Sequence, residues 1–246
     1  MFSRHFSAVI VLICSAFCLN AQENYRSEAN ILYNRERMAI INLNTNGIGV
    51  GYRQSKIKDA FKASFFQIDF STYWDIKEQK VAGLVNGFRP FKYGKINEIF
   101  FLKGGYGNIY KLTRKPDWGG VELQLAYSFG ANVCFAMPIY LYVQYPGEDF
   151  AIAERYDPAG EHSAVTTLGK GPYFKGILET KVYPGVHGNV GLYLEYGEYN
   201  NTVKAIEVGG AINIFPIGVP VMAYNDPKNV FFSFYINVIF GKRYNK

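Results

Sequence analysis

The feature that most restricts the fold of this chain is a strict alternation of apolar residues with polar or small ones through VELQLAYSFGANVCFA, residues 121–136. A period of two residues indicates a β-strand with one apolar face. Such a strand exceeds the five or six residues typical of soluble sheets, and it exceeds the roughly 9 to 11 residues that a tilted strand needs to cross a bilayer. The pattern therefore favours a sheet that spans a membrane.

The same alternation recurs along most of the chain and predicts further strands. The seven predicted strands are 39–53, 61–75, 95–112, 120–136, 185–197, 203–215 and 230–241. Bacterial single-chain barrels have an even number of strands, so we expect an eighth in 139–145 or 177–183. The predicted fold class is all-β: an antiparallel up-and-down transmembrane β-barrel of eight strands.

Composition supports this interpretation over the alternatives. Aromatic residues make up 17% of the chain, with 20 Tyr and 20 Phe, while the mean hydropathy is −0.06. A lipid-facing barrel with aromatic girdles and a polar interior combines these two properties. A secreted soluble β-sandwich also shows alternation, but it does not require strands of this length. No sustained period of 3.6 and no run of 18 apolar residues occurs after the first residues, which argues against helical membrane spans.

The first residues resemble a targeting segment. Arg4 and His5 precede the apolar run 8–19, which is too short to cross a bilayer as a helix, and a small-residue cleavage site precedes Gln22. We therefore expect a signal peptide at 1–21, an N-terminal periplasmic segment at 22–37, a barrel at 38–246, and export to the outer membrane.

The cysteine and charge content argues against an internal disulfide and against a nucleic-acid partner. Removal of the signal peptide leaves Cys134 as the one cysteine, so no internal disulfide is expected. It also leaves 25 basic residues against 20 acidic ones, because Arg4 is removed. The basic residues form no run of the kind that marks nucleic-acid binding, and we expect no nucleic-acid partner.

The stretch INLNTNGIGVGYR, residues 41–53, switches its apolar parity after Gly47. Asn46-Gly47 between alternating runs is typical of a hairpin turn. A second arm of only 48–53, however, is too short to cross a bilayer. We therefore interpret 39–53 as one strand with a bulge at Gly47, where glycine would supply a left-handed conformation. A hairpin in a soluble sandwich is the alternative.

The inner parity of the predicted strands carries charged residues. An eight-stranded barrel has an interior that side chains fill. We therefore expect a closed charged network there instead of a diffusion pore. Its predicted members are Arg53, Asp69, Lys103, Lys111, Glu122, Glu195 and Glu207.

The predicted strand count also orients the loops. With a periplasmic N-terminus and one strand at 39–53, the long segments 76–94 and 137–175 would face the periplasm. Known barrels usually show the reverse, with short periplasmic turns and long extracellular loops.

Four segments carry a resemblance: LNTNGIGVGYR (43–53), YGKIN (93–97), YPGVHGNVGLYLEY (183–196) and KAIEVGGAINIFP (204–216). They look like parts of small, uncharacterised outer-membrane β-barrel proteins of Bacteroidota. The resemblance covers most of the chain after the signal peptide and implies an outer-membrane barrel. It carries no catalytic motif, and a subunit role in barrel assembly or secretion is suggested by analogy alone.

Candidate catalytic and metal-binding residues are few. Adjacent residues on an extended chain point to opposite sides, so His162 and Ser163 do not form a base and nucleophile pair without a turn. His187 lies on an inner parity and is expected to be an interior hydrogen-bonded histidine. The acidic residues of one segment do not match an EF-hand spacing and are expected to be solvated; they are Glu148, Asp149, Glu154, Asp157 and Glu161.

We therefore expect no catalytic residue, metal or cofactor. GGYG at 104–107 resembles phosphate-binding glycines, but it lies in a strand without a following helix, and close packing in a narrow barrel explains it better. The sequence predicts a non-enzymatic barrel that serves as a structural or accessory subunit of an outer-membrane assembly or secretion complex. Outer-membrane lipid, lipopolysaccharide and other complex subunits are its expected partners. The alternatives are a rim enzyme acting on lipid or lipopolysaccharide, which would need His162 and the acidic cluster, and a narrow small-ligand barrel or pore.

Overall fold

The structure is a computed structural model that describes residues 33–81, 89–113, 120–145, 150–157, 167–197 and 201–245. The predicted signal peptide and all but the last residues of the segment 22–37 lie outside these ranges. The first strand begins at Arg35.

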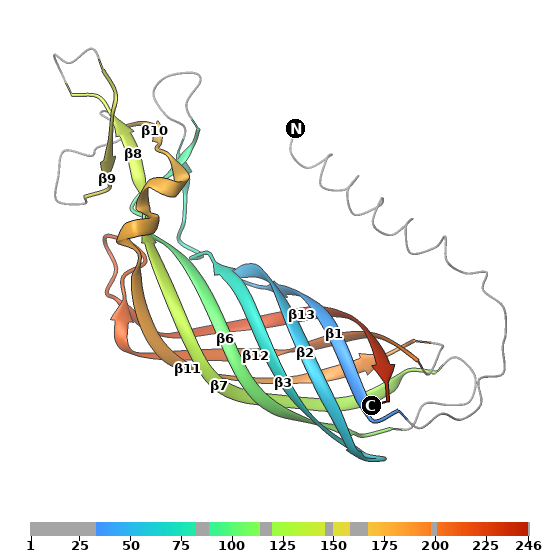
Figure 1. Ribbon diagram of the computed structural model, residues 1–246. Coiled ribbons are helices and arrows are strands. Elements are labelled where there is room, and N and C mark those ends of the chain that lie inside the picture. The colour runs from blue at the N-terminus through green and yellow to red at the C-terminus, as the bar shows by residue number, and fades with distance from the viewer. Residues whose placement is uncertain are drawn as a thin grey trace, which may run out of the picture. The chain divides into compact units, whose positions relative to one another are not determined.

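Eight long antiparallel strands close into one barrel (Figure 1). They are β1 (Arg35–Asn44), β2 (Gly47–Asp59), β3 (Lys62–Tyr73), β6 (Asn97–Lys111), β7 (Glu122–Pro138), β11 (Lys181–Glu195), β12 (Thr202–Val219) and β13 (Lys228–Tyr244). Their order around the barrel is β1-β13-β12-β11-β7-β6-β3-β2, and β2 pairs with β1 to complete the circle. The predicted fold class, an all-β antiparallel up-and-down barrel of eight strands, is confirmed. Within the described ranges, no helix has the length and apolarity needed to cross a membrane.

Alternation places one set of side chains outside and the other inside the barrel. On β7 the outward Phe129 is exposed, whereas the inward Asn132 and Cys134 are buried. Isoleucine, valine, leucine and phenylalanine are likewise exposed on the outward parity of the other strands, while buried polar residues lie on the inward parity. The apolar residues that cover the outside are thus the same ones that gave the period of two in the sequence.

The prediction of one bulged strand at 39–53 is wrong, because residues 45 and 46 form a hairpin turn between β1 and β2. Asn44 pairs with Gly47, and the register continues to Arg35 with Lys56. Strand β2 does not stop at Arg53 but runs on through polar residues for 13 residues in all, which removes the length objection to a hairpin. Gly94 is the one described residue with a left-handed φ, so Gly47 does not supply that conformation.

Gly47 is instead explained by a close approach of two strands. A Cβ at this position would lie 1.9 Å from the carbonyl oxygen of Thr72 on β3. The turn is further held by two backbone hydrogen bonds, from Thr45 N to Phe234 O (2.9 Å) and from Trp74 N to Asn46 O (2.7 Å). The hairpin therefore docks tightly against both neighbouring strands.

The eighth barrel strand comes from this hairpin, so its predicted location in 139–145 or 177–183 is also wrong. Residues 140–143 form β8 (Tyr140–Val143) of a separate three-stranded sheet with β9 (Ile152–Arg155) and β10 (Thr167–Lys170). Residues 177–179 belong to the 3-10 helix η1 (Tyr173–Glu179). A two-stranded sheet joins β4 (Lys80–Val81) to β5 (Phe91–Lys92).

The two ends of the barrel differ in their connections. At the end where β1 begins and β13 finishes, here the terminal end, Asn34 N donates to Asn245 Oδ1 at 3.0 Å. The opposite end, here the loop end, carries the long segments with β4, β5, β8–β10 and η1 (Figure 1). Because residues 39–53 belong to two strands and not to one, every later strand runs opposite to its predicted direction. The long segments therefore lie opposite the termini, and the predicted inverted loop arrangement is wrong.

Candidate functional site

The candidate site is the barrel interior, where inward side chains form layers from one mouth to the other. The central layer is polar. Arg53 forms an ion pair with Glu207 at 2.7 Å, and its Nε donates to Gln67 Oε1 at 2.6 Å. Gln67 Nε2 in turn donates to both carboxylate oxygens of Asp69, at 2.7 and 2.8 Å. Tyr235 donates its hydroxyl proton to Glu207 at 2.8 Å.

Lys103 lies in the same layer without a direct ion pair in the described chain. It is the register partner of Asp69, with only 5% of the residue exposed. His187 lies nearby, and its Nδ1 is 3.1 Å from the carbonyl oxygen of Ala131. A Cβ at Gly105 would be 2.9 Å from His187 Nε2, so glycine is required by the close packing of this layer.

The terminal mouth contains a second set of charges. Arg243 holds Glu36 through its Nε at 2.7 Å and Glu195 through its Nη2 at 2.7 Å. Lys111 pairs with Glu122 at 2.9 Å. These pairs satisfy the inward carboxylates near this mouth.

An apolar layer separates the two charged sets. The inward residues of β1 show it directly: Glu36 is followed by Met38 and Ile40 before Asn42. Phe65 and Ile239 belong to the same buried cluster.

The seven charged residues predicted for the lumen all point inward, but they do not form one network. Arg53, Asp69, Glu207 and Lys103 lie in the central layer, whereas Lys111, Glu122 and Glu195 lie at the terminal mouth. The prediction of a single closed network is corrected to two separate sets. The two sets are separate because apolar residues of the same inward parity lie between them, and the prediction did not take these residues into account.

Aromatic rings fill the lumen toward the loop end. Tyr73 packs edge-on against Phe231, with ring centroids 4.9 Å apart, and Phe101 lies 5.4 Å from Phe231. Phe215 stacks on Phe101 at 5.7 Å. Such offset and edge-to-face contacts are favourable for aromatic pairs. These four rings are here named the aromatic plug.

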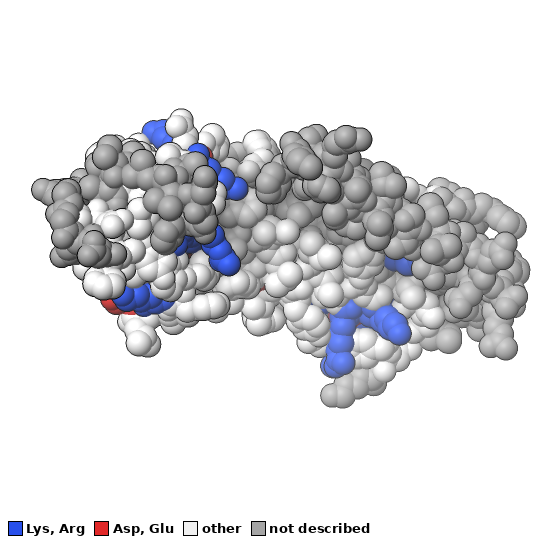
Figure 2. All heavy atoms as spheres, turned by 90° about the horizontal axis from the view of Figure 1, so that it is seen from above, with Lys and Arg blue, Asp and Glu red and all other residues white. Residues whose placement is uncertain are grey.

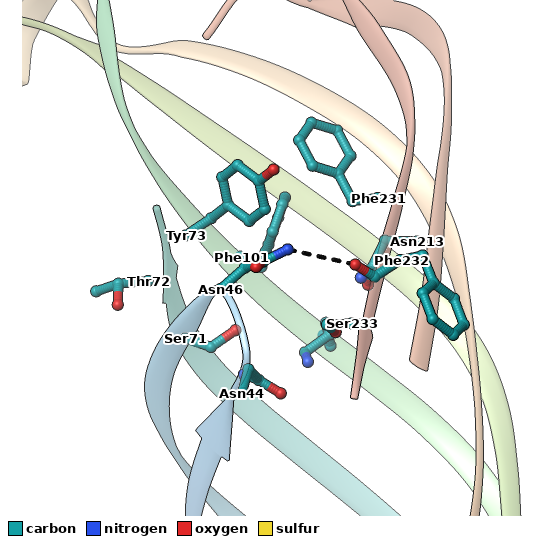
Figure 3. Close-up of a pocket in the computed structure, with 11 residues that line it drawn as sticks. Asn44, Asn46, Ser71, Thr72, Tyr73, Phe101, Asn213, Phe231, Phe232 and Ser233 are labelled. Carbon is teal, nitrogen blue, oxygen red and sulfur yellow. Dashed lines mark hydrogen bonds between the residues drawn. The ribbon is translucent and has the colours of Figure 1, made fainter. Parts of the chain in front are cut away.

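A small polar hollow lies beside the aromatic plug at the loop end (Figure 3). Asn44, Ser71, Asn213 and Ser233 contribute polar side chains to it, and Lys103 also lines it. Asn46 Nδ2 donates to the carbonyl oxygen of Phe232 at 3.4 Å across its edge. Asn132 donates to Asn213 at 2.8 Å. The hollow has room for no more than about one water molecule, and it supplies no nucleophile paired with a base.

Buried ion pairs close the loop end above the plug. Lys95 lies between Glu78 (2.6 Å) and Glu98 (2.7 Å), and Lys92 also pairs with Glu78. Lys170 of β10 reaches Glu98 at 3.2 Å. Burial lowers the pKa of Lys95, and the two glutamates oppose that shift. The cluster ties the segment after β3, the start of β6 and β10 together.

A further pair joins the end of β3 to the start of β13. Lys228 contacts the Asp75 carboxylate, and Lys77 N donates to Asp75 Oδ1 at 3.0 Å. Burial alone would raise the pKa of Asp75. The hydrogen bonds and charges of Lys228 and Lys77 outweigh burial and hold this pKa below its usual value.

Catalytic and metal-binding arrangements find no support in the described residues. These residues contain no group of three or more His, Cys, Asp or Glu side chains suited to a metal ion. Of the acidic segment, Glu154 accepts a hydrogen bond from Tyr145 at 2.9 Å, and Asp157 follows β9. His162, Ser163, Glu148, Asp149 and Glu161 lie outside the described ranges.

Sequence reasoning missed three parts of the site. Arg243 lies on the inward parity of β13, and extending the predicted strand beyond residue 241 would have found it. The aromatic plug also lies on inward parities, where aromatic residues were not expected. Lys95 precedes β6 in the structure, and although it shares the inward parity of the predicted strand 95–112, its two glutamate partners could not be inferred from that parity.

Comparisons with known proteins gave structural likenesses alone. No family model matches the chain, and no curated protein matches it. A major outer membrane protein from Thermus thermophilus has 10% identity and a TM-score of 0.46, over 87% of this chain and 100% of that chain. Ail, the attachment invasion locus protein of Yersinia pestis, has 9% identity and a TM-score of 0.42 over the same shares. Neisserial surface protein A has 13% identity and a TM-score of 0.40, over 86% and 97%. The barrel architecture itself rests on the strand pairing of this chain.

Proposed function

We propose that this protein is an outer-membrane β-barrel with a sealed lumen, exported by the signal peptide predicted at 1–21, and that it acts as a non-enzymatic structural or accessory subunit. The observation that carries the proposal is the combination of an apolar outer surface with a filled interior. Membership of a Bacteroidota barrel family stays a prediction from the sequence resemblance.

The outer surface supports a place in lipid. Exposed apolar side chains occur on all eight barrel strands; examples are Val50, Phe70, Leu102, Phe129 and Val190. Such a continuous apolar surface is costly in water and is what a lipid-facing barrel requires. Closure of the sheet also pairs the strand edges, which a bilayer would leave unsatisfied. Outer-membrane lipid and lipopolysaccharide are therefore the proposed surroundings.

The filled lumen supports a role other than diffusion. The aromatic plug, the central polar layer and the apolar layer follow one another along the interior. We expect no persistent ion-selective conductance when the purified protein is inserted into planar bilayers. Stable conductance steps would contradict a sealed lumen and would favour the small-ligand or pore alternatives.

The loop end supports a subunit role because it presents apolar side chains beyond the barrel. On η1, Phe174 is 74% exposed and Leu178 is 98% exposed, next to the buried Gly176 that packs on Pro138. Ile76 is exposed on another segment of the same end. Exposed apolar groups of this kind are suited to contacts with another subunit.

Purification from outer membranes in mild detergent tests the subunit role. We expect stoichiometric recovery of an assembly or secretion component with the wild type. The double variant F174S/L178S should lose that component while the barrel keeps its heat-dependent gel mobility. The double variant L112S/V121S, which removes two exposed apolar side chains at the terminal end, serves as the matched control. Recovery of the wild type alone, as a monomer, would contradict the subunit role.

A further inference from the structure

The terminal end carries a set of basic side chains on the outside of the barrel. β1 and β2 contribute Arg35, Arg37, Lys56 and Lys58, all on the outward parity. β3, β12 and β13 contribute Lys62, Lys204 and Lys242. These five strands are consecutive around the barrel, and the seven side chains are here named the basic collar. In the view of Figure 2, blue side chains form two separate groups, with white surface between them where the residues are described.

The members of the basic collar form no direct ion pair within the described part of the chain, although Asp59 is the register partner of Lys62 and attracts its charge. None of its members forms an ion pair with a carboxylate there. Their contacts are with tyrosines: the guanidinium of Arg37 lies 4.7 Å from the ring centre of Tyr244, and Lys62 Nζ lies 5.1 Å from that of Tyr110. Cations beside an apolar surface that form no ion pair in the described residues are suited to an anionic ligand from outside the chain.

A hollow on the outer surface gathers three members of the basic collar. Arg35, Lys56 and Lys58 line it together with the outward rings of Phe66 and Tyr106. Arg35 and Lys56 are register partners on neighbouring strands, so their charges stay close together. Basic groups above aromatic and apolar surface match a ligand with an anionic head and a hydrocarbon tail.

The position of the hollow indicates which leaflet of the outer membrane would supply its ligand. It lies at the terminal end, and short turns with the chain termini face the periplasm in bacterial barrels. We propose that this hollow binds the phosphate headgroup of an anionic glycerophospholipid from the periplasmic leaflet, with its acyl chains on Phe66 and the apolar belt. The inference rests on the proposed outer-membrane location and adds a ligand class to it.

Native mass spectrometry of the protein in mild detergent tests the inference. The probes are phosphatidylglycerol, phosphatidylcholine and a bisphosphorylated lipid A, each added separately to the micelles. The variant R35Q/K56Q/K58Q removes the charges of the hollow. The matched control K77Q/K80Q/K181Q removes three basic side chains from the loop end. Heat-dependent gel mobility establishes for each variant that the barrel is folded.

We expect the wild type to bind phosphatidylglycerol about tenfold more tightly than phosphatidylcholine, since each cation near an anionic surface contributes roughly fivefold before screening by salt. The hollow variant should lose this preference, and the control should keep it. Millimolar inorganic phosphate should not compete, because it lacks the acyl chains.

Three results would overturn the inference: equal binding of the two phospholipids, an unchanged preference in the folded hollow variant, or stronger binding of lipid A than of phosphatidylglycerol. Each of them leaves the membrane location intact. A wild-type protein that stays soluble without detergent would instead contradict the proposed function itself. The two failures are therefore distinguishable.

Discussion

The two ends of the barrel use basic residues in opposite ways. At the loop end, Lys95 is buried between two glutamates, and Lys228 holds Asp75. At the terminal end, the outward members of the basic collar face away from the chain without carboxylate partners in the described residues. Long connections at the loop end supply the carboxylates Asp75 and Glu78 that hold these lysines. At the terminal end, the inward Arg243 and Lys111 pair with carboxylates of the strands, whereas the outward basic residues form no such pair in the described residues. The direction in which a basic side chain points at this end therefore decides whether it joins the interior or stays on the outer surface.

The largest expected effect comes from the central layer that supports both ends. R53M should lower the free energy of unfolding by about 3–5 kcal/mol, because it leaves Glu207 buried without its ion-pair partner. Urea unfolding of the detergent-solubilised barrel measures this loss. Adding E207Q should recover part of it, since the amide removes the uncompensated charge. An R53M variant as stable as the wild type would show that the ends do not depend on this layer.

A smaller and more local effect is expected at the loop end. K95M should destabilise the closure of this end by about 2 kcal/mol, because Glu78 and Glu98 lose their shared partner while Lys92 and Lys170 remain. Limited proteolysis should cut near β8–β10 faster, with little change at the terminal end. K80M, at an exposed position of the same end, should cleave like the wild type. Equal acceleration at both ends would contradict a local role.

The Asp75 pair at the loop end predicts that the stability of the protein depends on pH. The pKa of Asp75 is lowered in the folded protein, so its stabilisation is fully present above the ordinary carboxyl value of about 3.9 and is lost as the pH falls through the lowered value. The unfolding temperature of D75N should be below that of the wild type at pH 7. The two should converge in strong acid. A difference that persists there would rule out the ion pair as its cause.

The smallest effect is expected from a single cation of the basic collar. K62Q should leave the free energy of unfolding nearly unchanged, because an exposed cation over the Tyr110 ring contributes little. Urea unfolding in uncharged detergent measures it. A loss comparable to that of R53M would show that the collar supports the fold, which would remove the contrast between the ends.

The alternation of apolar and polar residues predicted the barrel but not the boundaries of its strands. Seven strand regions and the total of eight were predicted, because one face of every strand is apolar. The hairpin at 45 and 46 was missed because the polar residues after Arg53 were assigned to a loop, although β2 continues to Asp59. One strand too few at the start then inverted the loop arrangement, since each strand reverses the direction of the next.

The site was harder to predict than the fold. Parity placed Arg53 and Glu207 on the inside, but no sequence pattern states which inward residues meet across the lumen. That depends on the register between strands far apart in the chain, such as β2 and β12. The pairing of Lys95 with Glu78 depends on how the segment after β3 folds over the mouth, which a period of two does not describe. The local alternation therefore predicts on which side of the sheet a side chain lies. Its contact partner depends on the register between strands that are distant in the sequence.

The pairing of β1 with β13 also sets an order of events in time. Ten residue pairs join the first barrel strand to the last, from Arg35 with Tyr244 to Asn44 with Tyr235. The strand that completes the circle is therefore the last of the eight barrel strands to be synthesised. Until it arrives, β1 keeps an open edge that can pair with any other available strand. The barrel can close only once β13 is available, so a factor that shields the edge of β1 would act before that moment.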